Sequence, residues 1–222
     1  MIDTSTVKLL SLVLLLAPAL GCLIAGFFGK KLGRAAVSWI TIILVGVSLA
    51  LAIYFMLLMT VIHPEVKAYD FNVYNWVDVT SIHFRIGFLI DRLTCYMMIV
   101  VTFVSFFVHI YSIGYMDDDP GYIRFFCYIS GFTFAMLSLV LANNFLLLYF
   151  GWEGVGLVSY LLIGFWFHRE KSNVASIKAF IVNRVGDLGF LLGIALVLMY
   201  TNSLDFQTVF SFMPGFAKHS TT

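Results

Sequence analysis

The chain has 222 residues, of which 61% are hydrophobic and only 11% are charged, and its mean hydropathy is +0.98. Soluble domains carry about 25% charged residues, so this composition excludes an ordinary soluble domain. The net charge of +1 gives no indication of a nucleic-acid partner. The sequence therefore predicts an all-α, polytopic protein of the lipid bilayer, organised as a single membrane domain over residues 1–222.

Six apolar runs are long enough to cross a bilayer, which requires about 17–25 residues of helix. The runs cover residues 9–28, 36–62, 93–113, 122–141, 145–167 and 174–200. The first is interpreted as a retained transmembrane helix and not as a signal peptide, because its charged N-terminal region is thin. Pro18 is expected to kink it. Short links predict that sequential helices are antiparallel.

The basic residues predict an orientation. Lys30, Lys31 and Arg34 occupy the first link, and Arg169 and Lys171 occupy the fifth, so both basic links fall on the same side of the membrane. The positive-inside rule assigns that side to the cytoplasm or the mitochondrial matrix. The N-terminus, and the segment between the second and third runs, are then expected outside.

The outside segment at residues 68–90 alternates with a period of two on both sides of residues 78–81, which predicts an extracytoplasmic β-hairpin. An isolated hairpin is marginally stable in water, so we expect it to lie against the ends of the spans or against a neighbouring subunit. Beyond the last run, apolar positions within residues 204–210 predict a short amphipathic helix at the outer surface, ended by Pro214.

Glu153 is the most informative residue, because it lies about 12 Å inside the fifth apolar run at 1.5 Å per residue. A charge near the middle of a span costs roughly 2.5–3.5 kcal/mol on insertion scales, and such residues usually serve ion or proton movement. No cation lies three or four residues away in the same run, so its partner is expected on another helix. Gly151, Gly154 and Gly156 provide small surfaces for close helix packing and water entry.

The sixth run contains the other candidate site residues. Arg184 and Asp187 are three residues apart and share a helix face, and counting from the opposite side of the membrane places both near the depth of Glu153. Lys178 lies nearer the inside and at a different angle. A purely structural ion pair is the open alternative for Arg184 and Asp187. These residues would move protons and do no covalent chemistry.

Other polar and sulfur-containing residues predict structural roles. His109 is expected to be a hydrogen-bonded core histidine, with a proton relay as the alternative. Cys22, Cys95 and Cys127 lie singly in apolar segments and are interpreted as small buried hydrophobes. No metal site or cofactor motif is predicted in this chain. Three further charged residues are expected to anchor helix ends at the interface: Asp91, Arg92 and Arg124.

A resemblance to a known family is carried by residues 151–166, which read Gly-Trp-Glu-Gly-Val-Gly-Leu-Val-Ser-Tyr-Leu-Leu-Ile-Gly-Phe-Trp. This block is similar to the signature of the large antiporter-like subunit of respiratory complex I, which is subunit L of the bacterial NADH–quinone oxidoreductase and chain 5 of the mitochondrial enzyme. The similarity continues at residues 110–116, 121–126, 136–148 and 179–189. The glycine-tryptophan-glutamate block is specific for the complex I and Mrp antiporter superfamily, and the extended match favours complex I.

The resemblance implies a proton-translocating subunit in the membrane arm of NADH:quinone oxidoreductase, which couples quinone reduction elsewhere in the complex to proton pumping. It implies that Glu153 belongs to a proton half-channel, that Arg184 and Asp187 tune it, and that Lys178 falls on a matching lysine. NADH, FMN, iron–sulfur clusters and quinone are then expected in partner subunits and none of them in this chain. The implied partners are other membrane-arm subunits in the bacterial inner (plasma) membrane or the mitochondrial inner membrane.

Family members have many more spans, built around two inverted repeats. This chain is expected to hold three leading spans, the hairpin and the first half of one repeat, so a fragment, a split subunit with a separate C-terminal half, and a truncated reading frame are all open. Two alternative functions are also open. One is an Mrp-type Na⁺/H⁺ antiporter or membrane-bound hydrogenase subunit. The other is a truncated structural or assembly subunit in which Glu153 is permanently paired.

Overall fold

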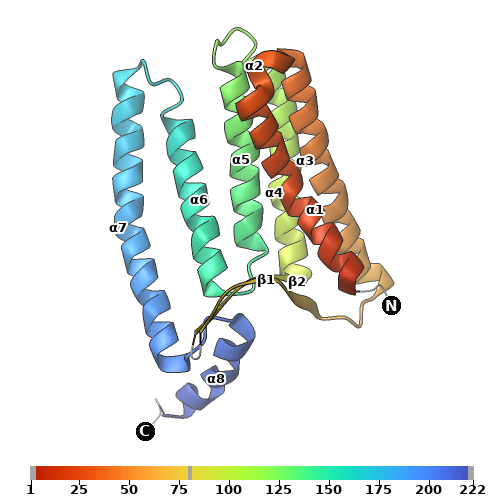
Figure 1. Ribbon diagram of the computed structural model, residues 1–222, viewed down its shortest axis with the longest axis vertical. Helices are drawn as coiled ribbons and strands as arrows, with labels where there is room; N and C mark the ends of the chain where they lie inside the picture. The colour runs from red at the N-terminus through yellow and green to blue at the C-terminus, as the bar shows by residue number, and fades with distance from the viewer. Residues whose placement is uncertain (1–3, 80–81, 220–222) are drawn as a thin grey trace.

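The computed structural model describes residues 4–79 and 82–219 (Figure 1). Six of its helical segments are long and apolar enough to cross a membrane, which confirms the predicted polytopic helical fold. The elements of the six spans, in chain order, are α1 (Thr4–Leu23), η1 (Ile24–Phe28), α2 (Gly29–Leu32), α3 (Arg34–Leu57), η2 (Leu58–Ile62), α4 (Arg92–Tyr115), α5 (Tyr122–Val140), α6 (Phe145–Ile163) and α7 (Glu170–Thr201). The two η elements are single π-helical turns that continue α1 and α3.

The helices form a group of four with two more added at one edge. α1, α3, α4 and α5 pack against one another, α6 packs on α5, and α7 packs on α6. Figure 1 shows the β-hairpin, the last helix and the N-terminus together at one end of the bundle, named the hairpin end below. The opposite end, where the α4–α5 and α6–α7 links lie, is named the link end.

Pro18 lies inside α1, and the helix continues through it to Leu23. Because proline has no N–H, the carbonyl oxygen of Leu14 loses its usual partner in the helix. The Ser48 hydroxyl on α3 donates a hydrogen bond to that oxygen at 2.8 Å, and both residues are fully buried. The contact between α1 and α3 therefore satisfies the group that the proline leaves open.

The predicted hairpin is present, with antiparallel strands β1 (Ala68–Val79) and β2 (Ile82–Asp91). The turn at residues 80–81 lies outside the described residues. Phe88 and Ile90 of β2 are 2% and 0% exposed and belong to the main hydrophobic core. This burial confirms that the hairpin lies against the ends of the spans, because the core cluster also contains side chains of α1, α3, α4 and α5.

The α5–α6 link holds the hairpin in place. Asn144 caps α6 by accepting the N–H of Leu147 at 2.9 Å, while its amide donates to the carbonyl oxygen of Arg85 on β2 at 2.9 Å. The Asn143 amide donates to the Asp70 carboxylate on β1 at 2.8 Å. One short link thus positions both the hairpin and the start of α6.

The predicted amphipathic helix is α8 (Phe206–His219), which packs at the hairpin end through Phe206 on Phe145, with ring centroids 4.8 Å apart. The prediction that Pro214 ends this helix is wrong, because α8 continues to His219. A proline removes only one N–H donor, and the backbone hydrogen bonds on either side can carry a helix past it.

Helix ends differ from the apolar runs by a few residues. α6 ends at Ile163 instead of residue 167, because the backbone leaves the helical conformation at Gly164, and α7 begins at Glu170 instead of residue 174. The three predicted helix-end anchors are confirmed. Asp91 caps α4 by accepting the Thr94 N–H at 2.7 Å, and Arg92 and Arg124 donate to the carbonyl oxygens of Pro64 and Phe165 at 2.9 and 3.0 Å.

Candidate functional site

The structure joins α6 and α7 through a cluster of charged residues. Arg184 of α7 donates a hydrogen bond from Nη1 to Oε2 of Glu153 on α6. The same guanidinium lies beside Asp187, with Nε 3.4 Å from Oδ2. The side chains of Arg184, Glu153 and Asp187 are 35%, 21% and 6% exposed. One cation is therefore shared by two carboxylates in the apolar part of two spans.

The position of this cluster agrees with the sequence. Glu153 has its cationic partner on another helix, and Arg184 and Asp187 share a helix face at its depth, as predicted. Lys178 stands apart, since it is exposed and lies about 9 Å along α7 from Arg184 at 1.5 Å per residue. The structure brings together three of the four candidate residues and leaves Lys178 outside the cluster.

Two further residues of the cluster were missed from the sequence. The Tyr149 hydroxyl donates to Oε1 of Glu153 at 2.8 Å, and the Trp152 indole N–H donates to Oδ1 of Asp187 at 2.7 Å. Tyr149 and Glu153 are four residues apart on one helix, and this spacing could have indicated their contact. Nothing in the sequence indicates the Trp152 bond, because it depends on how α7 rotates against α6.

The charges of the cluster do not balance. When both carboxylates are ionised, Glu153, Arg184 and Asp187 together carry one excess negative charge. Among the described residues, Nε of Arg184 is buried without a hydrogen-bond partner, so its contact with Asp187 is an ion pair and not a hydrogen bond. An unbalanced buried charge is costly in a medium of low polarity. The cluster can lower that cost by taking up one proton or by attracting a further cation.

There is space for water beside the cluster. A cavity of about 420 Å³ lies between α5, α6 and α7, and Asp187, Trp152 and Asn183 contribute to its lining. A water molecule needs polar partners in such a space, and Asp187 and Asn183 provide acceptors and a donor, whereas the Trp152 N–H is already donated to Asp187. At Gly156, an added Cβ would lie 3.6 Å from Nη2 of Arg184, so α6 passes within ordinary contact distance of the guanidinium. The site therefore has room for water beside the Asp187 carboxylate.

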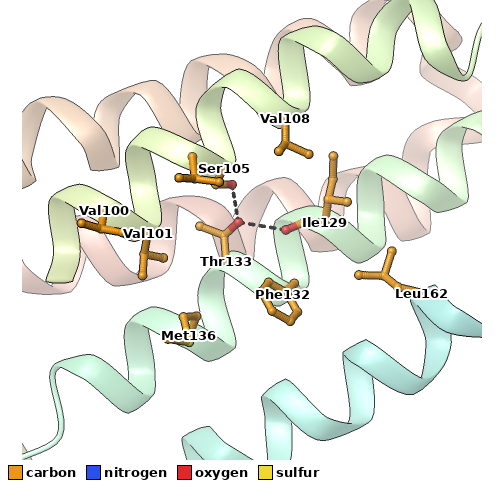
Figure 2. Close-up of a pocket in the computed structure, with 10 residues that line it drawn as sticks. Val100, Val101, Ser105, Val108, Ile129, Phe132, Thr133, Met136 and Leu162 are labelled. Carbon is orange, nitrogen blue, oxygen red and sulfur yellow. Dashed lines mark hydrogen bonds between the residues drawn. The ribbon is translucent and has the colours of Figure 1, made fainter. Parts of the chain in front are cut away.

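A second cavity, also of about 420 Å³, lies between α4, α5 and α6 and has a different character (Figure 2). Most of its lining is aliphatic. Figure 2 shows that its two hydroxyls are already paired, with Ser105 bonded to Thr133 and Thr133 donating to the carbonyl oxygen of Ile129. This cavity therefore offers no free polar group for an ion.

His109 lies next to that cavity between α4 and α5 and is 0% exposed. Its Nδ1 is 2.8 Å from the carbonyl oxygen of Ser105, and its Nε2 is 3.0 Å from the Ser130 hydroxyl. Both ring nitrogens are thus hydrogen-bonded within the protein, as predicted for a core histidine.

Comparison with known proteins supplies the family. A family model described as NADH-ubiquinone oxidoreductase (complex I), chain 5 N-terminus, matches residues 76–126. A second, described as NADH:quinone oxidoreductase/Mrp antiporter, TM, matches residues 142–222, which include the whole charged cluster.

Individual relatives agree with these matches. NADH-quinone oxidoreductase subunit L of Neisseria meningitidis serogroup B is 54% identical over 208 residues, which are 93% of this chain and 31% of the relative. NADH-ubiquinone oxidoreductase chain 5 of Trichophyton rubrum is 45% identical over 207 residues, 92% of this chain and 31% of the relative. The chain therefore spans about a third of the length of these curated relatives.

A solved structure shows the same fold. It is the membrane-bound sulfane sulfur reductase, an archaeal respiratory membrane complex, in which one chain superposes with a TM-score of 0.76. The superposition covers 90% of this chain and 39% of that one, at 15% sequence identity. Taken together, the two family models and the relatives show that the chain is a multi-pass membrane protein that belongs to the family of large antiporter-like subunits of respiratory complex I, and that it matches their N-terminal part.

Proposed function

We propose that this chain acts in a proton-translocating membrane-arm subunit of NADH:quinone oxidoreductase, and that Glu153 is a proton-binding group of its half-channel. The observation that carries the proposal is the sharing of Arg184 between Glu153 and Asp187 inside the apolar layer. Glu153 and Asp187 are two acids and Arg184 is one base, so the binding of one proton would neutralise the cluster.

The proposed cycle uses the position of Arg184. When Arg184 pairs with Glu153, the carboxylate is held ionised, with Tyr149 as a second donor. When the guanidinium turns fully towards Asp187, Glu153 loses its cationic partner, and a proton takes the place of that cation. The Trp152 indole fixes the orientation of the Asp187 carboxylate that receives the guanidinium. Lys178 is the next ionisable residue of α7 towards the link end, and we include it in the path.

The setting of this activity is proposed from the family. The partners would be other membrane-arm subunits of the complex, in a bacterial inner membrane or a mitochondrial inner membrane. NADH, FMN, iron–sulfur clusters and quinone would be held by partner subunits. Lys30, Lys31, Arg34, Arg169 and Lys171 lie at or beside the link end, and the positive-inside rule assigns that end to the cytoplasm or matrix. The hairpin end and the N-terminus would then face outside.

The test is Glu153→Gln in the assembled complex, in sealed membrane vesicles. Glutamine keeps the side-chain shape and an acceptor for Tyr149 but cannot exchange a proton with water. We expect normal amounts of assembled complex on native gels and fewer protons moved per NADH oxidised. Glu170→Gln, which removes an exposed carboxylate from the first turn of α7, is the matched control and should pump normally. Normal pumping by well-assembled Glu153→Gln complex would refute the proposal.

The same variant distinguishes proton translocation from a purely structural role of the ion pair. If the ion pair only fastens α7 to α6, Glu153→Gln would reduce the amount of assembled complex, and the complex that does assemble would pump normally.

One alternative function is consistent with the second family model, because its description names the Mrp antiporter together with NADH:quinone oxidoreductase. In that case the same cluster would serve Na⁺/H⁺ exchange. A pull-down from gently solubilised membranes distinguishes the two. NADH-oxidising and quinone-binding subunits should come down with this chain, whereas a set of small membrane subunits alone would favour the antiporter.

A further inference from the structure

Two cysteines that are far apart in the sequence meet inside the bundle. Sγ of Cys22 on α1 lies 3.5 Å from Sγ of Cys127 on α5, across 105 residues of chain. Both thiols are free and half-buried. Each cysteine lies singly in its apolar run of the sequence, and spacing along the chain cannot show that α1 and α5 bring Cys22 and Cys127 together.

The packing around the pair is built from glycines. An added Cβ at Gly26 would lie 3.3 Å from Sγ of Cys127, and one at Gly131 would lie 3.2 Å from Sγ of Cys22. The Cys127 sulfur therefore packs against Gly26, and the Cys22 sulfur packs against Gly131. Larger residues at these glycines would push the sulfurs apart. Figure 1 shows α1 and α5 close together towards the link end, in agreement with the packing of these two helices.

The third cysteine has different surroundings. Cys95 is fully buried at the hairpin end, where its Sγ lies 3.7 Å from Sδ of Met59. A thioether cannot form a disulfide. Cys95 therefore serves as a control within the same chain.

We propose that Cys22 and Cys127 are an oxidation site, at which hydrogen peroxide converts the two thiols into a reversible intramolecular disulfide. A disulfide needs an S–S distance of about 2.05 Å, so the sulfurs must approach by about 1.5 Å. Side-chain rotation and a small shift of two closely packed helices can supply that movement. The product would tie α1 to α5 by a covalent bond.

The reaction is balanced with peroxide as the oxidant. The thiolate of one cysteine attacks an oxygen of the peroxide, an S–O bond forms, the O–O bond breaks, and hydroxide leaves. The second thiolate then attacks the sulfenic sulfur, an S–S bond forms, the S–O bond breaks, and a second hydroxide leaves. The two thiol protons convert both hydroxides to water. Two electrons pass from the sulfurs to the peroxide.

The location favours a small neutral oxidant. Cys127 lies about 8 Å along α5 from its start at the link end, at 1.5 Å per residue. Hydrogen peroxide is neutral and small enough to enter such an apolar layer. A charged peptide thiol enters it poorly, so the disulfide would be reduced slowly once formed.

The experiment uses the assembled complex in its membrane. Vesicles are treated with increasing hydrogen peroxide, the protein is unfolded in detergent with N-ethylmaleimide to block the remaining thiols, and digested peptides are identified by mass spectrometry. We expect a peptide pair linked through Cys22 and Cys127, with matching loss of N-ethylmaleimide on both residues. Cys95 should stay alkylated. Dithiothreitol added before the alkylation should restore the thiols of Cys22 and Cys127.

Variants sharpen the result. Cys22→Ser and Cys127→Ser should each abolish the linked pair, and Cys95→Ser should leave it unchanged. The wild-type chain alone can overturn the proposal, so it does not depend on the variants folding. Peroxide that leaves both thiols alkylated, or oxidises them to sulfinic acid with no linked peptide, would overturn it. Equal yields of all three cysteine pairings would do the same.

Discussion

At Gly151, α6 packs closely against the backbone of α5. A Cβ at this position would lie 2.6 Å from both Cα and N of Leu139, which are backbone atoms and cannot turn aside. We expect Gly151→Ala to push α6 away from α5 and to destabilise the protein by about 1–3 kcal/mol, the usual cost of overpacking. The thermal unfolding midpoint and the yield of purified complex measure the effect.

Gly156→Ala is the matched control for that substitution. Its added Cβ would meet Nη2 of Arg184 at 3.6 Å, which is an ordinary contact. This variant should unfold at nearly the wild-type temperature. Equal destabilisation by both substitutions would show that the approach of Leu139 does not explain the result.

At the candidate site, three of the four charged residues were correctly brought together from the sequence, and the spacing of Tyr149 could have added that residue, but the Trp152 bond was not predictable. The depth of Glu153 and the spacing of Arg184 and Asp187 follow from a helical rise that hardly varies. The Trp152 bond to Asp187 depends on the rotation of one helix against another, which the sequence does not encode locally. The meeting of Cys22 and Cys127 was hidden for the same reason.

Among the elements, α1 depends on α3 at its proline. Ser48→Ala would leave the buried carbonyl oxygen of Leu14 without its partner. We expect a loss of stability of about 1–2 kcal/mol, in the range of hydrogen bonds between membrane helices. Ser11→Ala is the control, because the buried Ser11 hydroxyl donates to the carbonyl oxygen of Val7, which also accepts a helical hydrogen bond. Unfolding midpoints of the two variants should differ, and equal midpoints would contradict this role of Ser48.

The elements themselves were predictable to the extent that hydropathy defines them. The six apolar runs correspond to six helices, and the segment that alternates with a period of two corresponds to the hairpin. Their ends were less predictable, because Gly164 stops α6 while apolar residues continue beyond it. In α8 the opposite error was made, because Pro214 was expected to end the helix and the helix continues past it.

At the scale of the whole molecule, Asp119 connects separate segments of the chain at the link end. It lies in the α4–α5 link and accepts hydrogen bonds from the Trp166 indole at 2.9 Å and from the Gly121 N–H at 2.6 Å. Arg34, at the start of α3, donates to the carbonyl oxygens of Asp117 and Asp119. The Asp119 carboxylate thus connects the α6–α7 link to the α4–α5 link, and the backbone of the α4–α5 link is bonded to the start of α3.

The hydrogen bond from Trp166, helped by Gly121 and by the charges of Arg124 and Arg34, holds the pKa of Asp119 below its ordinary value despite some desolvation. A lowered pKa in the folded state means that the ionised carboxylate adds stability above the ordinary aspartate range near pH 3.9. That stability is lost as the pH falls through the lowered pKa.

We therefore expect Asp119→Ala to lower the unfolding midpoint of the complex at pH 7, and its difference from the wild type to shrink as the pH falls to about 4 and below. Asp118→Ala removes a neighbouring exposed carboxylate and is the matched control. If the difference in unfolding midpoint stayed constant across this pH range, the charge of Asp119 would contribute nothing to stability at the link end.

The depth of Glu153 also gives the site an electrical property. Glu153 lies about 12 Å along α6 in an apolar layer about 30 Å thick, so a proton that reaches it from the hairpin end crosses roughly 40% of the membrane. A full crossing is worth about 2.3 kcal/mol per 100 mV, so this step is worth about 0.9 kcal/mol. If Glu153 carries the translocated proton as proposed, release of that proton to the hairpin end, which would face outside, is the step done against an outside-positive potential, and 100 mV would change the equilibrium of that step about fivefold.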